Sequence, residues 1–326
     1  MIAELSRPIV FTPYYKPVIW GGDAIGRLKG ERIDIDSVGE SWEISAVPGH
    51  ESVVAEGPLA GIDIVELMRR YGADFIGTEP AARFGCDTFP LLIKFIDAQR
   101  DLSVQVHPGD ALAAERHASP GKTEMWYVVD ARPGSRIYSG LQAPLTREEY
   151  PRCAADGSIM QRIGVHEAQA GQFYFIPAGT LHAIGAGTLV AEVQQTSDIT
   201  YRVYDYGRVD VDGRPRQLHT AQAAEAIDYR FPNPVEPTAK CFTCNTPGVV
   251  NCRYFNVDYV AGGEVAVGGD PASFTVLMAV GGDAEITGAD GARTRVRRGT
   301  TAMLAAAAPV HKVVAGGALL VITIKK

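Results

Sequence analysis

The residues best suited to chemistry are two imidazoles, a carboxylate and an amide, carried by three separated segments of the chain. Gln105 and His107 lie two residues apart in one segment, and Glu124 comes directly before the apolar run MWYVV. His182 follows the turn-forming sequence PAGTL. A single histidine more often makes a structural hydrogen bond than a metal bond. Together, however, the three segments supply two nitrogen and two oxygen donors, a set that suits zinc with one position open for water or substrate.

The first of these segments, LSVQVHP, alternates in the manner of a strand. A side-chain period of two places Ser103, Gln105 and His107 on one face, and Val104 and Val106 on the other. Polar side chains inside a barrel are unfavourable unless a metal ion and a bound substrate satisfy them. The alternative is that this face is the solvent side of an edge strand.

Two cationic side chains accompany the candidate ligands. Lys122 shares a strand face with Glu124, so an ammonium and a carboxylate point into the same space; the alternative is a weak surface ion pair. Glu192 lies on an expected strand, and Arg202 begins the next strand beyond a polar turn. The planar guanidinium of Arg202 suits a phosphate or a developing oxyanion, and the alternative is a surface pair with Asp205.

Short β-rich runs, separated by Gly, Pro and Asp, must position these side chains. Examples are SWEISAVP, FPLLIKFIDA, EMWYVVDA and QFYFIPAG. Runs this short predict a β-sandwich or barrel rather than alternating strands and helices. Helical spacing is confined to a few segments that we expect as inserts between strands, namely 62–71, 109–117, 145–163 and 219–226.

The sequence FPNPVEP at 231–237 has three prolines in seven residues and predicts an extended connection. We therefore expect a catalytic, metal-binding domain over 1–230 and a smaller β-barrel domain over 231–326. In the second domain, runs such as SFTVLMAVGG and KVVAGGALLVITI are separated by turn signals. This pattern predicts an antiparallel meander closed into a barrel or sandwich, without a cluster of catalytic residue types.

The composition excludes several classes of protein. A hydrophobic content of 46% can supply a large core, which excludes a disordered or fibrous chain. The formal charge of −7 and the pI near 5.6 give no general attraction to nucleic acid or an anionic membrane, so a phosphate-bearing ligand needs a local cluster of Lys and Arg. Five cysteines without a signal-peptide pattern predict reduced thiols and a cytoplasmic protein.

Several motifs in the first two-thirds of the chain match one known family in the same order. They are IWGG at 19–22, GESWEIS at 39–45, FPLLIKF at 89–95, LSVQVHP at 102–108, KTE at 122–124, PAGTLH at 177–182 and TYR at 200–202. The chain therefore resembles the type I mannose-6-phosphate isomerases of the short bacterial kind, which are cupins. The ten-residue interval from Glu192 to Arg202 is also that of the family.

The resemblance implies a mainly β fold with two cupin-like jelly-roll or barrel modules and short helical inserts. The separate helical domain of the eukaryotic-type enzymes is expected to be absent or reduced to inserts around 109–163. One zinc ion per chain is implied at the positions matching Gln105, His107, Glu124 and His182. Catalytic roles are implied for Arg202, Lys122 and Glu192, and substrate-binding roles for Ser103, Lys94 and Trp20.

The implied activity is an aldose–ketose isomerisation that interconverts mannose 6-phosphate and fructose 6-phosphate through a zinc-stabilised cis-enediol. The expected partner is a small sugar phosphate, with neither nucleic acid nor membrane involved, and the protein is expected to be a monomer or homodimer. One alternative is a non-catalytic sugar-binding cupin, in which the ligand positions would be degraded. The other is a different metal-dependent cupin enzyme, which would usually carry a GxHxH pair where this chain has QxH.

Overall fold

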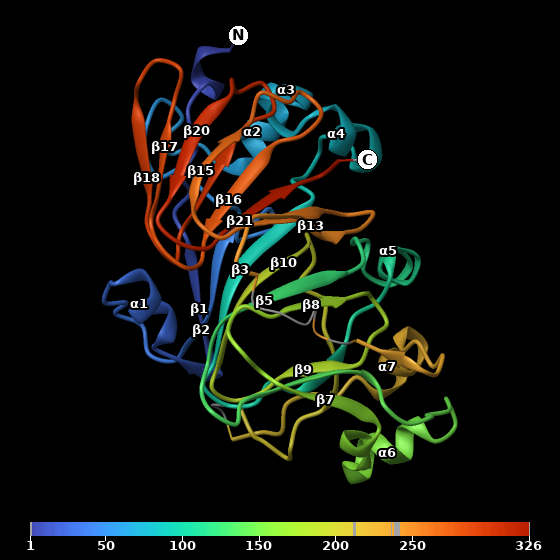
Figure 1. Cartoon of the computed structure of the whole chain (residues 1–326). Coiled ribbons are helices and arrows are strands. Elements are labelled where there is room, and N and C mark those ends of the chain that lie inside the picture. The colour runs from blue at the N-terminus through green and yellow to red at the C-terminus, as the bar shows by residue number, and fades with distance from the viewer. Residues whose placement is uncertain (1, 211–212, 236, 238–241, 326) are drawn as a thin grey trace.

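The structure is a computed structural model that describes residues 2–210, 213–235, 237 and 242–325. Its strands form four antiparallel sheets, two in each of two modules (Figure 1). The fold is mainly β, with two cupin-like modules as expected, and short helices join or flank the strands.

The first module carries every candidate ligand and catalytic residue. Its larger sheet has the order β1 (Tyr14–Gly22), β2 (Val38–Ile44), β3 (Leu91–Ala98), β10 (Thr188–Gln195), β5 (Glu124–Ala131) and β8 (Phe173–Ile176). Its second sheet has the order β11 (Tyr201–Tyr204), β4 (Val104–Val106), β9 (His182–Ile184), β6 (Arg136–Leu141) and β12 (Asn233–Pro234), and β7 (Ile163–Glu167) also pairs with β6. The pairs β3·β10, β4·β9, β5·β8 and β6·β7 are nested, which is the strand arrangement of a jelly roll.

The second module repeats this arrangement with shorter connections. One sheet has the order β13 (Thr246–Asn251), β14 (Asn256–Val260), β21 (Leu319–Thr323), β16 (Thr275–Ala279) and β19 (Thr301–Leu304). The other has the order β15 (Gly263–Val267), β20 (His311–Ala315), β17 (Ala284–Thr287) and β18 (Arg293–Val296). The nested pairs are now β14·β21, β15·β20, β16·β19 and β17·β18.

The expectation of a meander in the second module was therefore wrong, although that of a sandwich or barrel was right. Among the described strands of this module, only β13–β14 and β17–β18 are hairpins of consecutive strands. The other consecutive strands cross from one sheet to the other. Turn signals and alternation are the same in both arrangements, because they report where a strand ends and which face it buries but not which strand it pairs with.

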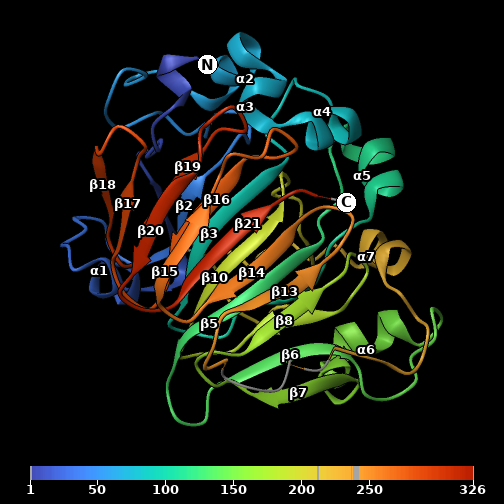
Figure 2. The same ribbon diagram turned by 45° about the horizontal axis from the view of Figure 1, so that its top comes forward.

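The two modules pack against each other through one face of each larger sheet. Leu91, Ile93 and Phe95 of β3 belong to a large apolar cluster that also contains Val257 and Ile322 of the second module. Alternate residues of β3 turn to the interior of the first module. Figure 2 shows the orange and red strands of the second module lying over the cyan to green strands of the first. A sheet buried on both faces explains why FPLLIKF is almost continuously apolar.

Three of the four expected helical segments form helices close to their expected bounds. They are α2 (Ile64–Tyr71), α5 (Asp110–His117) and α7 (Thr220–Ala226). The side chain of Asp63 caps α2 by accepting a hydrogen bond from the backbone N–H of Glu66 at 2.8 Å. The segment 145–163 forms only α6 (Tyr150–Asp156) and a 3₁₀ turn (Ser158–Gln161), because Gly157 adopts a left-handed conformation that ends the helix.

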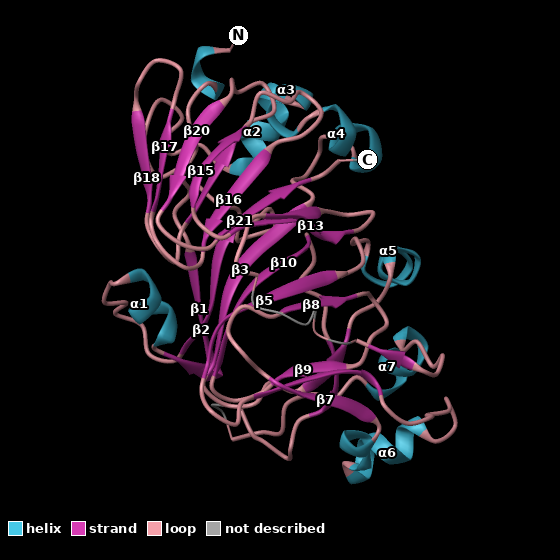
Figure 3. Cartoon of the chain, viewed as in Figure 1, coloured by secondary structure: helices cyan, strands magenta, loops and turns pink. Residues whose placement is uncertain are grey.

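Three further helices and one 3₁₀ turn were not expected from the sequence. They are α1 (Ala24–Lys29), α3 (Ala73–Ile76), α4 (Thr78–Phe84) and the turn Ala3–Leu5. Figure 3 shows that the helices lie at the edges of the sheets. Within the described residues no helix exceeds eight residues, and none is long and apolar enough to cross a membrane. The domain boundary at residue 231 stays a prediction, and the strand Asn233–Pro234 pairs with β6 of the first module.

Candidate active site

Two rows of side chains face the interior of the first module, one row on each sheet. In the larger sheet, residues paired directly across five neighbouring strands form the row Trp42, Lys94, Glu192, Trp126 and Tyr174. In the second sheet, four paired residues form the row Arg202, Gln105, His182 and Ser139. Residues paired in this way project from the same face of a sheet. The register therefore gathers polar groups that are far apart in the sequence.

His107, Glu124 and His182 converge inside this module. Each offers one ligand atom, and these atoms lie within 4.8 Å of one another. Nε2 of His107 is 3.4 Å from Oε2 of Glu124, and Nε2 of His182 is 3.4 Å from Oε1 of the same carboxylate. Ligands bonded at about 2.0 Å to a tetrahedral zinc ion are separated by about 3.3 Å. The two imidazole–carboxylate separations are close to this value, so the group could hold one metal ion.

The hydrogen bonds of the two histidines determine which ring nitrogen is available. Nδ1 of His107 lies 2.9 Å from the carbonyl oxygen of Ile199, and Nδ1 of His182 lies 2.8 Å from that of Thr180. A carbonyl only accepts, so each Nδ1 carries the proton and each Nε2 keeps its lone pair. Among the described residues, Nε2 of His182 and both oxygens of Glu124 are buried without a hydrogen-bond partner. A metal ion would satisfy buried acceptors of this kind.

Lys122 places a positive charge beside these ligands. Its Nζ is 3.0 Å from Nε2 of His107 and 3.1 Å from Oε2 of Glu124. Burial lowers the pKa of His107 to about 3, with Lys122 as the next cause, and burial also lowers the pKa of His182. Burial alone would raise the pKa of Glu124, but Lys122 and the two histidines hold it well below its usual range. At pH 7 His107 and His182 are thus neutral and Glu124 is anionic, which are the forms that a metal ion binds.

Gln105, the fourth expected ligand, lies in the second row directly beside His182. It is partly exposed and lines an open cavity together with Ser103. Val104 and Val106 point the other way, into an apolar cluster beneath α6 and α7. The alternation predicted from LSVQVHP is therefore present, and its polar side faces the interior of the first module. Because β4 lies between β11 and β9, the alternative of an exposed edge strand is wrong.

Glu192 belongs to a buried chain of charges on the opposite sheet. Nζ of Lys94 is 3.3 Å from Oε2 of Glu192 and 3.2 Å from Oε2 of Glu40. The indole N–H of Trp126 donates to Oε1 of Glu192 at 2.8 Å, and that of Trp42 donates to Oε2 of Glu40 at 2.7 Å. One lysine thus holds two carboxylates, and each carboxylate also has an indole partner.

The two carboxylates of this chain have pKa values shifted in opposite directions. Burial, and then the charge of Glu124, raises the pKa of Glu192. Burial acts the same way on Glu40, but Lys94 and Lys16 outweigh it and lower the pKa of Glu40 to about 2. Glu192 is therefore the carboxylate better suited to accept and return a proton near neutral pH.

Arg202 and Arg216 form a cationic wall near β11. Nη1 of Arg202 donates to the carbonyl oxygen of Gln217 at 2.8 Å, while its Nε is buried without a hydrogen-bond partner in the described part of the chain. Nε of Arg216 donates to Oδ2 of Asp205 at 2.7 Å, and its Nη2 donates to Oδ1. The suggested surface pair between Arg202 and Asp205 does not form, because Asp205 pairs with Arg208 and Arg216 instead.

A cavity of about 340 Å³ lies between the two rows, and it joins these groups into one site. The expected residues that line it are Trp20, Lys94, Ser103, Gln105, Lys122, Glu192 and Arg202. The other three expected residues, His107, Glu124 and His182, adjoin it behind Lys122 and Gln105. All ten site residues expected from the sequence are thus brought together by the fold.

Known proteins resemble this chain in both sequence and structure. Residues 10–130 match the family described as "Phosphomannose isomerase type I, catalytic domain". The protein YvyI of Bacillus subtilis strain 168, which carries a provisional mannose-6-phosphate isomerase name, is 42% identical over 225 residues, 68% of each chain. The mannose-6-phosphate isomerase of Streptococcus mutans is 37% identical over 233 residues, 72% of each chain. The crystal structure of mannose 6-phosphate isomerase from Bacillus subtilis superposes with a TM-score of 0.83 and 33% identity, covering 97% of this chain and 99% of the other.

The chain belongs to the type I phosphomannose isomerase family. The level of identity to these relatives is sustained over more than two-thirds of the chain, and the fold matches over nearly all of it.

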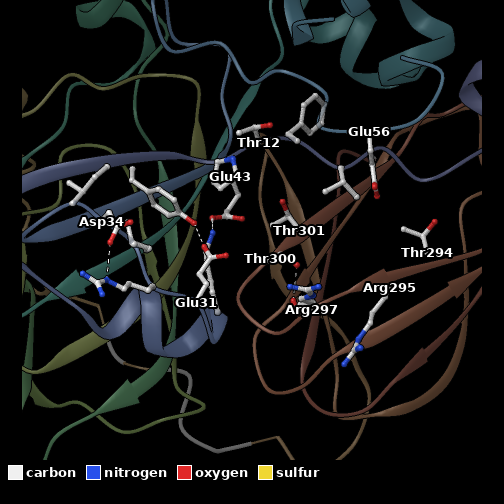
Figure 4. A pocket seen from close by; sticks show the side chains of 18 of the residues that line it. Thr12, Glu31, Asp34, Glu43, Glu56, Thr294, Arg295, Arg297, Thr300 and Thr301 are labelled. Carbon is white, nitrogen blue, oxygen red and sulfur yellow. Dashed lines mark hydrogen bonds and ion pairs between the residues drawn. The ribbon is translucent and has the colours of Figure 1, made fainter. Parts of the chain in front are cut away.

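A larger cavity, of about 870 Å³, lies between the two modules of this phosphomannose isomerase family member (Figure 4). Its buried charged groups satisfy one another. Nζ of Lys29 is 2.7 Å from Oε1 of Glu43 and 3.0 Å from Oγ of Ser41, and the hydroxyl of Tyr15 donates to Glu31. The cavity that adjoins the histidines is smaller, but beside it lie buried ligand atoms that make no hydrogen bond within the described part of the chain. The chemical groups therefore identify the smaller cavity as the candidate active site.

Sequence reasoning missed several residues that line the site of this family member. They are Lys16, Glu40, Trp42, Asp198, Thr200 and Arg216. Glu40 and Trp42 lie in the motif GESWEIS and could have been found there, since strand alternation places both on one face. Arg216 follows a polar loop with no periodicity, so nothing in the local sequence places it in the site.

Proposed function

We propose that the protein interconverts mannose 6-phosphate and fructose 6-phosphate with one zinc ion held by Gln105, His107, Glu124 and His182. The observation that carries this proposal is the convergence of buried ligand atoms of His107, Glu124 and His182 within 4.8 Å of one another, beside a cavity with cationic walls. Nε2 of His182 has no hydrogen-bond partner among the described residues, and the contact of Glu124 with Lys122 is an ion pair at 3.1 Å. Membership of the type I phosphomannose isomerase family supports the substrate, because its relatives are named mannose-6-phosphate isomerases. We also propose residues 1–230 as the catalytic domain.

Zinc, when bound, would supply a Lewis acid that polarises the sugar oxygens at C1 and C2. The donor set fits it, because two imidazoles, a carboxylate and an amide oxygen leave a position for the substrate when the zinc ion takes a fifth ligand. The carbonyl partners of the two Nδ1 atoms hold each imidazole in the tautomer and orientation that the metal requires.

Glu192 is the proposed proton carrier. In the conversion of the aldose to the ketose, a proton leaves C2 and O1 gains a proton, which gives a cis-enediol; the O2 hydroxyl then loses its proton and C1 gains one. A carboxylate whose pKa is raised by burial is a stronger base than an ordinary one, and Glu192 has that property. Lys94 keeps this carboxylate in place, and the indole N–H of Trp126 fixes its other oxygen.

Lys122 and Arg202 are the proposed electrostatic partners. As the enediol forms, negative charge grows on the oxygens at C1 and C2, and fixed cations stabilise that charge most in the transition state. Nζ of Lys122 lies beside the ligands, and Nε of Arg202 is buried with no described group to bind. Lys122 stays the alternative base, because its Nζ lies beside the candidate ligands His107 and Glu124.

The test is turnover of mannose 6-phosphate in deuterated solvent, with the fructose 6-phosphate formed measured in a coupled assay. We expect the wild-type protein to convert the substrate. Deuterium should appear in the product to the extent that the proton held by the base exchanges with solvent before it returns to the sugar. Glu192→Gln should keep its metal and lose about 10²–10⁴-fold in kcat. Loss of turnover in Lys122→Met but not in Glu192→Gln would assign the base to Lys122. Wild-type protein that binds the substrate without converting it would support the non-catalytic alternative instead.

A further inference from the structure

Asp110, the first residue of α5, accepts hydrogen bonds from both modules. Its Oδ1 accepts from the backbone N–H of Gly121 at 3.0 Å and from the side-chain N–H of Gln195 at 2.9 Å. Its Oδ2 accepts from the hydroxyl of Tyr254 at 2.8 Å. Tyr254 lies in the connection between β13 and β14, so its hydroxyl reaches the first module from the second. One carboxylate thus joins the second module to the segment that carries Lys122.

The backbone on both sides of Lys122 depends on this carboxylate. The N–H of Gly121 donates to Asp110 directly, and the N–H of Thr123 donates to Oε1 of Gln195 at 2.9 Å. Because Nε2 of Gln195 donates to Asp110, the amide of Gln195 is held in the orientation that Thr123 needs. The lysine is therefore flanked by two backbone hydrogen bonds, and both lead to the same carboxylate.

The contact between Gly121 and the start of α5 is also too close for a larger residue. A Cβ at position 121 would lie 2.6 Å from the backbone nitrogen of Asp110 and 2.8 Å from the carbonyl carbon of Gly109. Packed atoms do not approach so closely, so a side chain there would push the lysine segment away from the helix. Packing and hydrogen bonding thus fix the segment in the same place.

The ionisation of Asp110 and Tyr254 strengthens the link between the modules. Burial alone would raise the pKa of Asp110, but hydrogen bonds from Gln195, Tyr254 and Gly121 lower it. Burial, and then the bond to Asp110, raises the pKa of Tyr254 to about 12. At pH 7 the carboxylate is therefore ionised and accepts only, while the tyrosine keeps its proton and donates it. Hydrogen bonds to an ionised carboxylate are stronger than those between neutral groups.

The side chain of Lys122 is the catalytic group that depends on this arrangement. Its Nζ is 3.0 Å from Nε2 of His107 and 3.1 Å from Oε2 of Glu124. A lysine side chain is long and flexible, so its ammonium group is placed accurately only when the backbone beneath it is fixed. A displacement of about 1 Å at a catalytic group can cost about 10²-fold in rate.

We propose that Asp110 and Tyr254 are positioning residues that hold Lys122 in place for catalysis, and that the second module acts on the active site through them. This inference rests on the proposed isomerase function, in which Lys122 stabilises the charge of the developing enediol. Neither Asp110 nor Tyr254 lines the active-site cavity. They act through the backbone of the lysine rather than on the sugar.

The test measures kcat and KM for mannose 6-phosphate in three variants. Asp110→Ala loses all three hydrogen bonds, and kcat should fall about tenfold or more while KM stays within about threefold, because Lys122 acts mainly in the transition state. Asp110→Asn keeps Oδ1 as an acceptor, so its kcat should stay within about threefold of wild type. Tyr254→Phe loses one hydrogen bond and should lower kcat about two- to tenfold.

The matched control is Asp63→Ala. Asp63 is also a partly buried aspartate that accepts a backbone hydrogen bond at the start of an eight-residue helix, α2, and it does not line the active-site cavity. The melting temperature should fall in both alanine variants, but kcat of Asp63→Ala should stay within about threefold of wild type. An equal loss of kcat in the control would show that lower stability explains the effect, and would overturn the inference.

Metal content shows whether each variant is loaded. Unchanged kcat in folded, metal-containing Asp110→Ala would overturn the inference and leave the isomerase function intact. Metal loss in that variant would also overturn it, because the contacts would then support the ligands rather than Lys122. If Asp110→Ala does not fold, Tyr254→Phe decides, and an unchanged kcat in this variant contradicts the proposal.

No turnover of mannose 6-phosphate by wild-type protein would instead refute the proposed function. Hydrogen–deuterium exchange of the peptide that contains residues 121–124 then tests the positioning alone. We expect faster exchange of its backbone N–H groups in Asp110→Ala and Tyr254→Phe than in wild type, because each variant loosens the segment. Equal exchange in all three proteins would overturn the positioning role.

Discussion

Replacing Lys94 with methionine tests whether the carboxylate of Glu192 is the proton carrier. Lys94 is 3.3 Å from Glu192 and is 6% exposed, so its charge acts on Glu192 through little solvent. At this separation the attraction is about 5 kcal/mol in an effective dielectric of about 20. Even a quarter of that attraction corresponds to about one pKa unit, at about 1.4 kcal/mol per unit. We therefore expect Lys94→Met to raise the pKa of Glu192 further, because Lys94 is the charge that most opposes the rise.

The assay is the pH dependence of kcat/KM for mannose 6-phosphate. A base must be ionised to act, so activity falls as the pH falls through its pKa, and a raised pKa moves this acidic limb to higher pH. The matched control is Lys16→Met, which loses a 3.9 Å contact with Glu40 and a contact with the Trp42 ring but no contact with Glu192, and should leave the limb in place. An unmoved limb in folded, metal-containing Lys94→Met would refute Glu192 as the base.

Further variants separate metal binding, rate and stability. His107→Ala and His182→Ala should each lose the metal, as measured by elemental analysis. Arg202→Ala should keep the metal and lose about 10²–10³-fold in kcat. Metal loss in the Arg202 variant would overturn the electrostatic role proposed for Arg202. The folded-state pKa of Glu40, about 2, is below its ordinary value of 4.5, so its ion pair stabilises the fold above pH 4.5 and stops doing so as the pH falls through about 2. Glu40→Gln should accordingly be about 2–3 kcal/mol less stable than wild type to urea at pH 6, with the difference shrinking toward pH 2. A difference independent of pH would show that the Glu40 charge is not what stabilises the fold.

Alternation and turn signals were sufficient to anticipate the polar interior of the first module. The segment LSVQVHP predicts which side chains share a face, and Ser103 and Gln105 do line the cavity while Val104 and Val106 pack outward. That prediction succeeds because the period of a strand is a local property of the chain.

Pairing between strands and contributions from loops could not be anticipated in the same way. The nested pairs of the second module were missed because partner choice depends on contacts far along the chain. Arg216 was missed because its place in the cavity depends on Asp205, eleven residues earlier, rather than on any local pattern. The ion pairs of Lys94 with Glu40 and Glu192 likewise arise only when three strands lie side by side.

The most direct measurement compares isomerase activity and zinc content in one preparation before chelation, after chelation and after zinc is restored. We expect about one zinc ion per chain at first, no conversion of mannose 6-phosphate after its removal, and recovery of activity in proportion to the zinc taken up. Full turnover by protein shown to contain no metal would contradict the claim that His107, Glu124 and His182 form a catalytic zinc site.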